Sequence, residues 1–194
     1  MNSMDLEKKI QLNSILDEYI KENALNISDN NYKITNGKSS YTVTKKFFDK
    51  PHEKVTGTTT EVIGIGSYDD NNLTLVVMLN PKTFTTGLEK RDQEMDKFFK
   101  SEAIFTINDL QLNKAEGEDL RIDQKITGKV LVNGLEKNID FQVTGLLTDN
   151  SVTAEGIAEA KISDFGITPP NLLNVYTMDD AVTLNFEINA IKSQ

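Results

Sequence analysis

The single histidine, His52, limits the catalytic chemistry open to this chain. An imidazole-based zinc site or a Ser-His-Asp nucleophile would have to use that one residue. His52 lies in the polar run Asp49-Lys50-Pro51-His52-Glu53, which is typical of an exposed loop. Because the sequence also lacks cysteine, it excludes disulfides, thiolate metal sites and cysteine nucleophiles. We therefore expect no metal centre and no nucleophilic catalyst.

Carboxylates are the next candidates for chemistry, and their spacing is unfavourable. Glu155 and Glu159 share one face of a predicted strand, where four residues separate them by about 13 Å. The paired carboxylates of glycosidases stand about 5 to 9.5 Å apart. The run Asp69-Asp70-Asn71-Asn72 lacks the central glycine and distant glutamate of an EF-hand and predicts a hairpin turn. Gly64-Ile65-Gly66 lacks the third glycine of a dinucleotide-binding loop. These patterns predict a protein that is not an enzyme and requires no cofactor.

The overall charge and hydropathy disfavour several classes of partner. A formal net charge of −9 and a pI near 4.7 oppose binding to phosphate backbones and anionic lipid headgroups, so we expect no nucleic-acid partner. No stretch reaches the roughly 18 apolar residues of a membrane-spanning helix, so we expect no integral membrane segment. Charged residues in 5–9 stand where a signal peptide would have its apolar region. The chain as written is expected in the cytoplasm, or in the periplasm or outside the cell if a signal peptide was removed.

The first 25 residues predict one amphipathic helix, an accessory segment before the domain formed by residues 26–194. Neither Pro nor Gly occurs in this segment, and apolar residues recur at helical spacing. These residues are Leu12, Ile15, Leu16, Tyr19 and Ile20. We expect this apolar face to pack on the following domain, with a homodimer contact or a lid over that domain as alternatives.

From Tyr32 onward apolar residues alternate with a period of two, which predicts antiparallel strands with one wet face. Asn133-Gly134 lies between two such runs and is the strongest hairpin signal in the sequence. The segment 90–100 breaks the pattern and predicts a short inserted helix, and 171–176 predicts a helical turn. Because long strands with open edges aggregate, a closed barrel is favoured over a sandwich.

The strand predicted at 151–163 indicates an interior that its own side chains do not fill. Its inward positions are mostly small, namely Val152, Ala154, Gly156, Ala158, Ala160 and Ile162. Protein interiors are dense, so the missing volume is either filled from across the barrel or left for an apolar ligand. In the first case the space would be filled by Phe47, Phe105, Phe141 and Phe186.

Several segments resemble the YceI family of lipid-binding, lipocalin-like barrels. Residues 127–137, TGKVLVNGLEK, are similar to a family hairpin, and 161–167, KISDFGI, resemble its D-F-G-I/V segment. Residues 180–188, DAVTLNFEI, are similar to its closing strand, which begins D-x-V. Arg91-Asp92 followed by Phe98-Phe99 resembles its helix between strands. The resemblance extends over about 32–191.

The resemblance implies an all-β fold, an eight-stranded antiparallel lipocalin-like barrel with a short inserted helix, and the N-terminal amphipathic helix predicted above is an addition to it. Family members bind isoprenoid quinones, polyprenyl chains or other long-chain amphiphiles. It therefore implies that this chain sequesters or transports such a hydrophobic ligand, an isoprenoid or other long-chain lipid, in the barrel interior. The alternative is a non-enzymatic interaction module with a packed barrel and a partner bound through the N-terminal helix.

The residues expected to contact the ligand mostly have inward parity. These are Tyr41, Val43, Leu75, Val77, Phe105, Ile107, Phe141, Val143, Leu184 and Phe186. Phe165 and Leu173 are expected near the mouth of the pocket, and Phe84 near one end. Arg91 is a candidate to meet a polar headgroup, with a structural ion pair to Asp92 or a neighbouring carboxylate as the alternative.

Overall fold

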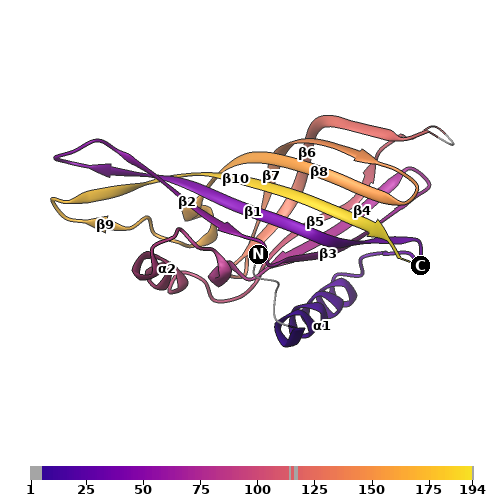
Figure 1. Cartoon of the computed structure of the whole chain (residues 1–194), viewed down its shortest axis with the longest axis horizontal. Coiled ribbons are helices and arrows are strands. Elements are labelled where there is room, and N and C mark those ends of the chain that lie inside the picture. Colours follow the sequence, from indigo (N-terminus) through magenta and orange to yellow (C-terminus); the bar gives the residue numbers. More distant parts are fainter. Residues whose placement is uncertain (1–5, 114, 116–117, 194) are drawn as a thin grey trace.

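The computed structural model of the chain describes residues 6–113, 115 and 118–193. These residues form one curved antiparallel sheet with two α-helices and two short 3-10 helices (Figure 1). In chain order the elements are α1 (Leu6–Glu22), β1 (Asn31–Phe47), β2 (Glu53–Thr59), β3 (Val62–Asp69), β4 (Asn72–Leu79), η1 (Pro81–Thr83), α2 (Glu89–Asp96), β5 (Ala103–Gln111), β6 (Leu120–Val132), β7 (Leu135–Leu147), β8 (Ser151–Lys161), η2 (Ile162–Phe165), β9 (Asn171–Leu172) and β10 (Tyr176–Lys192).

Pairing between β1 and β10 closes the sheet into a barrel. β2 and β3 both pair with β1 and follow one register, because Ser39 faces Thr59 and Tyr32, seven residues earlier, faces Gly66. They therefore act as a single interrupted strand, while β9 is a two-residue extension beside β10. Within the described residues the wall thus has eight strands, which confirms the predicted eight-stranded barrel with an N-terminal helix and one short inserted helix.

Two of the predicted hairpin turns have the backbone conformation that their residues favour. Asn133 and Gly134 adopt φ of 55° and 78° between β6 and β7, and Asp70 and Asn71 adopt 49° and 67° between β3 and β4. Two successive residues of positive φ make the tight turns that match the twist of a hairpin, and Asn, Asp and Gly tolerate this conformation best. The local sequence therefore sets the register of both hairpins.

Helix α1 packs against the outer wall of the barrel, as the apolar stripe predicts (Figure 1). Leu12 and Leu16 are buried against a cluster that includes Val76 and Met78, whose side chains are completely shielded from solvent. The Tyr19 hydroxyl lies 3.2 Å from Oγ1 of Thr106 on β5. The apolar outward positions of β4 are thus explained by the helix that covers them. Residues 1–5 of the predicted helix lie outside the described residues.

The helical turn predicted at 171–176 is wrong. Asn171 and Leu172 form β9, which pairs with Thr177 and Tyr176 of β10. The chain reverses between them through Asn174 at a φ of 60°, and pairing with β10 replaces the local helical bonds. The strand predicted at 151–163 also ends earlier, at Lys161. Among the described helices, none is both long and apolar enough to span a membrane.

Candidate functional site

An apolar cavity of about 270 Å³ lies within the barrel and is lined by residues from every strand of its wall. The lining runs from Tyr32 and Tyr68 at one end to Phe84 and Pro170 at the other. The Tyr32 hydroxyl donates to the carbonyl of Thr148 at 3.1 Å, and that of Tyr68 donates to the carbonyl of Leu112, so both rings are fixed across the first end. The cavity is therefore a lengthwise apolar space of the kind that holds small hydrophobic ligands.

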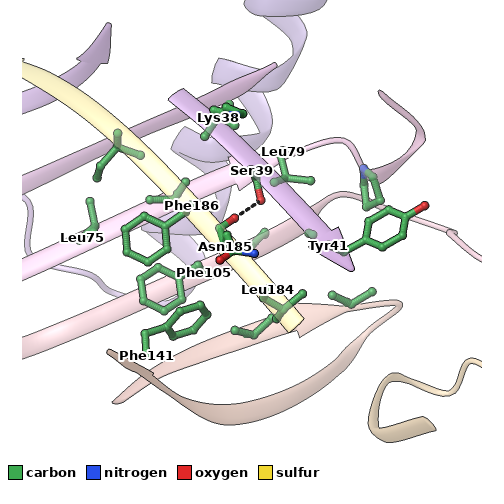
Figure 2. Close-up of a pocket in the computed structure, with 18 of the residues that line it drawn as sticks. Lys38, Ser39, Tyr41, Leu75, Leu79, Phe105, Phe141, Leu184, Asn185 and Phe186 are labelled. Atoms are coloured by element: carbon green, nitrogen blue, oxygen red, sulfur yellow. Dashed lines mark hydrogen bonds between the residues drawn. The ribbon is translucent and has the colours of Figure 1, made fainter. Parts of the chain in front are cut away.

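Three phenylalanine rings occupy the middle of the interior without filling it (Figure 2). The centroid of Phe141 lies 5.2 Å from that of Phe105 and 5.6 Å from that of Phe186. A Cβ added at Gly156 would lie 2.3 Å from the Phe186 ring, and one at Gly128 would lie 2.0 Å from the Phe105 ring. These two glycines let the rings lie directly against the barrel wall. The space over Gly156 is therefore filled by Phe186, its direct partner on the neighbouring strand β10, while Val152, Ala154 and Ile162 line the remaining space.

Tyr41 lies toward the other end of the cavity from the three rings (Figure 2). Its side chain is buried and packs edge-on against Phe84, with ring centroids 5.1 Å apart. Burial, with a smaller contribution from the Asp92 carboxylate and partial opposition from Arg91, raises the pKa of Tyr41 to about 12. The hydroxyl therefore keeps its proton at neutral pH and is a hydrogen-bond donor beside a mostly apolar lining.

The pair Arg91-Asp92 anchors α2 at this end of the barrel. Nη2 of Arg91 lies 3.0 Å from Oε1 of Glu53 on β2, so the guanidinium forms the structural ion pair rather than lining the cavity. The Asp92 carboxylate accepts hydrogen bonds from the Thr85 hydroxyl at 2.8 Å and from the backbone and hydroxyl of Thr86 at 2.9 and 2.6 Å. Desolvation raises the pKa of Asp92, but these hydrogen bonds and Arg91 outweigh it and lower that pKa below its ordinary value.

Twelve of the fourteen residues predicted to contact a ligand lie on the cavity lining. They are Tyr41, Val43, Leu75, Val77, Phe84, Phe105, Ile107, Phe141, Val143, Phe165, Leu184 and Phe186. Arg91 does not line it, and Leu173, expected near the mouth, is 80% exposed on the turn after β9. Phe47, expected inside if the barrel were packed, instead stacks on Tyr176 with centroids 6.0 Å apart.

Sequence reasoning missed part of the lining. Leu79, Val182 and Ile188 share the parity of predicted residues on their own strands and were identifiable from it. Ile126 and Val130 lie on the apolar face of β6, a strand that contributed no residue to the prediction. Met95, Phe98 and Phe99 also line the cavity, from α2 and the segment after it. Their helical spacing was visible in the sequence, but the placement of that segment across the barrel end was not.

The other candidates for chemistry lie apart from one another and outside the cavity. His52 is exposed in the loop between β1 and β2. Glu155 accepts a hydrogen bond from the Thr144 hydroxyl at 3.1 Å, and Glu159 accepts one from Thr183 at 2.6 Å, both on the outer wall. Among the residues that the structure describes, no group of three or more His, Cys, Asp or Glu side chains is arranged to hold a metal ion.

Comparison with known proteins agrees with this geometry. A polyisoprenoid binding domain from Saccharophagus degradans, implicated in plant cell wall breakdown, superposes with a TM-score of 0.65 at 17% identity, covering 84% of this chain and 98% of that one. BcnA of Burkholderia cenocepacia superposes with a TM-score of 0.57 at 17% identity, covering 79% and 95%. No relative was found among curated protein sequences. The sequence of residues 32–190 matches the YceI-like domain, and the chain therefore belongs to the YceI family.

Proposed function

We propose that the protein binds a long-chain isoprenoid, or a similar amphipathic lipid, in the barrel interior and sequesters or transports it. The observation that carries this proposal is the lengthwise cavity with its almost wholly apolar lining. An apolar cavity has nothing to offer a polar solute but binds hydrocarbon readily. The family and the polyisoprenoid binding domain with the same fold support the choice of an isoprenoid.

Chain length should dominate the affinity. Each buried methylene contributes about 0.8 kcal/mol, or about a fourfold change in Kd. Association itself costs at least about 4 kcal/mol, so roughly the first five buried methylenes only offset that cost. Short ligands should therefore bind weakly, and affinity should rise with chain length until the cavity is full.

The few polar groups on the lining favour an amphipathic ligand over a pure hydrocarbon. The Ser39 hydroxyl is already used, since it donates to the carbonyl of Asn185 at 3.2 Å (Figure 2). The Tyr41 hydroxyl, protonated at neutral pH, is the donor that we assign to a headgroup oxygen at the end near Phe84. The proposed activity is binding without chemical change, because the candidate acids and the histidine lie on the outer surface.

The test is organic extraction of the purified, folded protein followed by mass spectrometry of the extract. A stoichiometric isoprenoid or fatty amphiphile supports the proposal and identifies the ligand class. Native mass spectrometry with added ubiquinone and with polyprenols of increasing length then measures uptake and its length dependence. An empty extract with no uptake of any added lipid would refute the proposal and favour the alternative of an interaction module that binds a partner through α1.

A further inference from the structure

Two hairpins project beyond the barrel at one end (Figure 1). Their tips expose apolar side chains. Phe48, at the tip of the β1–β2 hairpin, is 67% exposed, and Leu173, at the tip of the β9–β10 hairpin, is 80% exposed. The two tips adjoin, because the Phe48 amide donates to the carbonyl of Val175 at 3.4 Å. We define the tip patch as Phe48, Leu172, Leu173 and Val175, all of them exposed.

Positive charge surrounds the tip patch although the chain as a whole is acidic. Residues 45–54 contain four lysines against two acidic residues, and 170–178 contain no charged residue, so these two segments carry a net charge of +2. Lys46 is paired with Asp179 at 2.5 Å at the base of the hairpins, whereas Lys50 lies in the loop at the tip. Since the whole chain carries −9, the remainder carries −11. Lys45 and Lys50 lie over aromatic faces, 3.8 Å from the Tyr176 ring and 4.0 Å from the Phe47 ring. The ammonium groups of these two lysines thus rest on the aromatic faces of the hairpins in cation–π contacts.

The hairpins hold the tip patch and Lys50 away from the acidic body. Phe48 lies five residues beyond Val43, which is buried in the barrel core. Five residues of extended strand span about 16 Å, roughly two Debye lengths at physiological ionic strength. When the tips approach an anionic surface first, salt therefore largely screens the repulsion between that surface and the acidic barrel.

The tip patch adjoins the end of the cavity. Pro170 and Met178 both line the cavity, and they bracket β9 and the turn that carries Leu173. The amide of Met178 donates to the carbonyl of Pro170 at 3.0 Å, which closes the base of that hairpin. A surface that met the tips would therefore also face this end of the cavity.

We propose that the tip patch docks the barrel on an anionic lipid bilayer. Phe48 and Leu173 enter the apolar side of the headgroup region, and Lys50, two residues beyond Phe48, meets a lipid phosphate. Exposed apolar side chains flanked by lysines suit such an interface, where apolar burial and attraction to anionic lipid act together. The purpose of docking rests on the proposed lipid binding, because docking places the end of the cavity against the membrane from which the lipid ligand enters.

The experiment is flotation of the full chain with phosphatidylcholine vesicles that contain or lack phosphatidylglycerol. Wild-type protein should float with the anionic vesicles and much less with the neutral ones. F48S/L173S should abolish flotation. The matched control is I157S/I191S, which changes two residues of 49% and 54% exposure on the barrel wall and should float like wild type.

Charge is tested separately. A lysine near an anionic surface contributes about 1 kcal/mol, so K50Q should weaken binding to anionic vesicles by about fivefold. K33Q removes the same charge from an exposed position on the barrel wall and should have little effect. Circular dichroism checks that every variant is folded.

Docking is overturned if wild-type protein does not bind anionic vesicles, or if the tip and wall variants bind them equally. It is also overturned if the tip variants change only self-association in sedimentation, because the tip patch would then be a contact between copies of the chain. Uptake of ubiquinone added in detergent is measured in parallel. If wild-type protein binds vesicles but takes up no ubiquinone, the proposed function alone is refuted. If it takes up ubiquinone but does not bind vesicles, docking alone is refuted.

Discussion

Replacing Val77 by aspartate is the sharpest test of the cavity as a lipid site. Val77 lies on β4 opposite Phe105 of β5, and its side chain lines the cavity. Aspartate is close to valine in size, so the substitution changes polarity more than volume. A hydrocarbon chain that fills the cavity must then either strip water from a carboxylate or bind with the carboxyl group protonated.

The cost of protonating the new carboxyl group sets the upper limit of the loss in lipid-binding free energy. At pH 7, protonating a carboxyl group of ordinary pKa about 3.9 costs about 4 kcal/mol, at about 1.4 kcal/mol per pH unit. Val77→Asp should therefore weaken lipid binding by up to about 1000-fold at pH 7 but by only about 10-fold at pH 5. The sign follows from linkage, because the bound lipid raises the pKa of the new carboxyl and binding then takes up a proton. Val77→Asn is uncharged and should show a loss independent of pH.

Titration with a fluorescent isoprenoid analogue at pH 5 and pH 7 measures these affinities. The probe must supply the signal, because the sequence contains no tryptophan. Val77→Ala controls for lost volume, and Ile157→Asp places the same charge on the exposed outer wall. If folded Val77→Asp binds the probe as tightly as Val77→Ala at pH 7, lipid does not occupy the cavity at β4 and the reasoning fails.

Three further predictions concern the elements that hold the site. Leu16→Ala should lower the free energy of unfolding by about 2 to 4 kcal/mol, because Leu16, on the buried face of α1, is only 3% exposed. Ile10→Ala, at a 62% exposed position of the same helix, should change it by under about 0.5 kcal/mol, and urea unfolding of both variants measures the difference. Because burial raises the pKa of Tyr41 to about 12, the folded state keeps a proton that the unfolded state loses from about pH 10. Between about pH 10 and 12 the free energy of unfolding of wild type should therefore fall by about 1.4 kcal/mol per pH unit relative to that of Tyr41→Phe. Parallel stability curves for those two proteins would contradict this burial effect. The lowered pKa of Asp92 stabilises wild type over Asp92→Asn above the ordinary pKa of 3.8. In chemical unfolding this difference in stability should vanish as the pH falls through the folded-state pKa of Asp92. A difference that persists at lower pH would contradict this explanation.

Local pattern was sufficient for most of the wall. A period of two predicts which face of a strand is apolar, and Asn133-Gly134 predicts where one hairpin turns, since both depend on neighbouring residues only. The stripe through Leu12 and Leu16 predicts a helix for the same reason. The placement of Tyr41 and Val77 on the inner face follows from parity once the barrel is assumed.

Contacts between distant segments account for what local pattern did not predict. The segment 171–176 has no strong local preference, and its first two residues form β9 because β10 offers them hydrogen-bonding partners. Arg91 is drawn to Glu53, 38 residues away in the chain, rather than to a ligand. Leu173 is apolar like the residues of the lining, but the turn that holds it projects beyond the barrel.

The sequence by itself determined the alternating strands with one apolar face and the apolar stripe of the N-terminal helix. Only the tertiary structure decided how far the interior is filled. The reason is that packing depends on pairs such as Phe186 over Gly156 and Phe105 over Gly128, whose members lie on different strands. Parity says that each of these residues faces inward, but the space left between opposite walls is a property of the closed barrel.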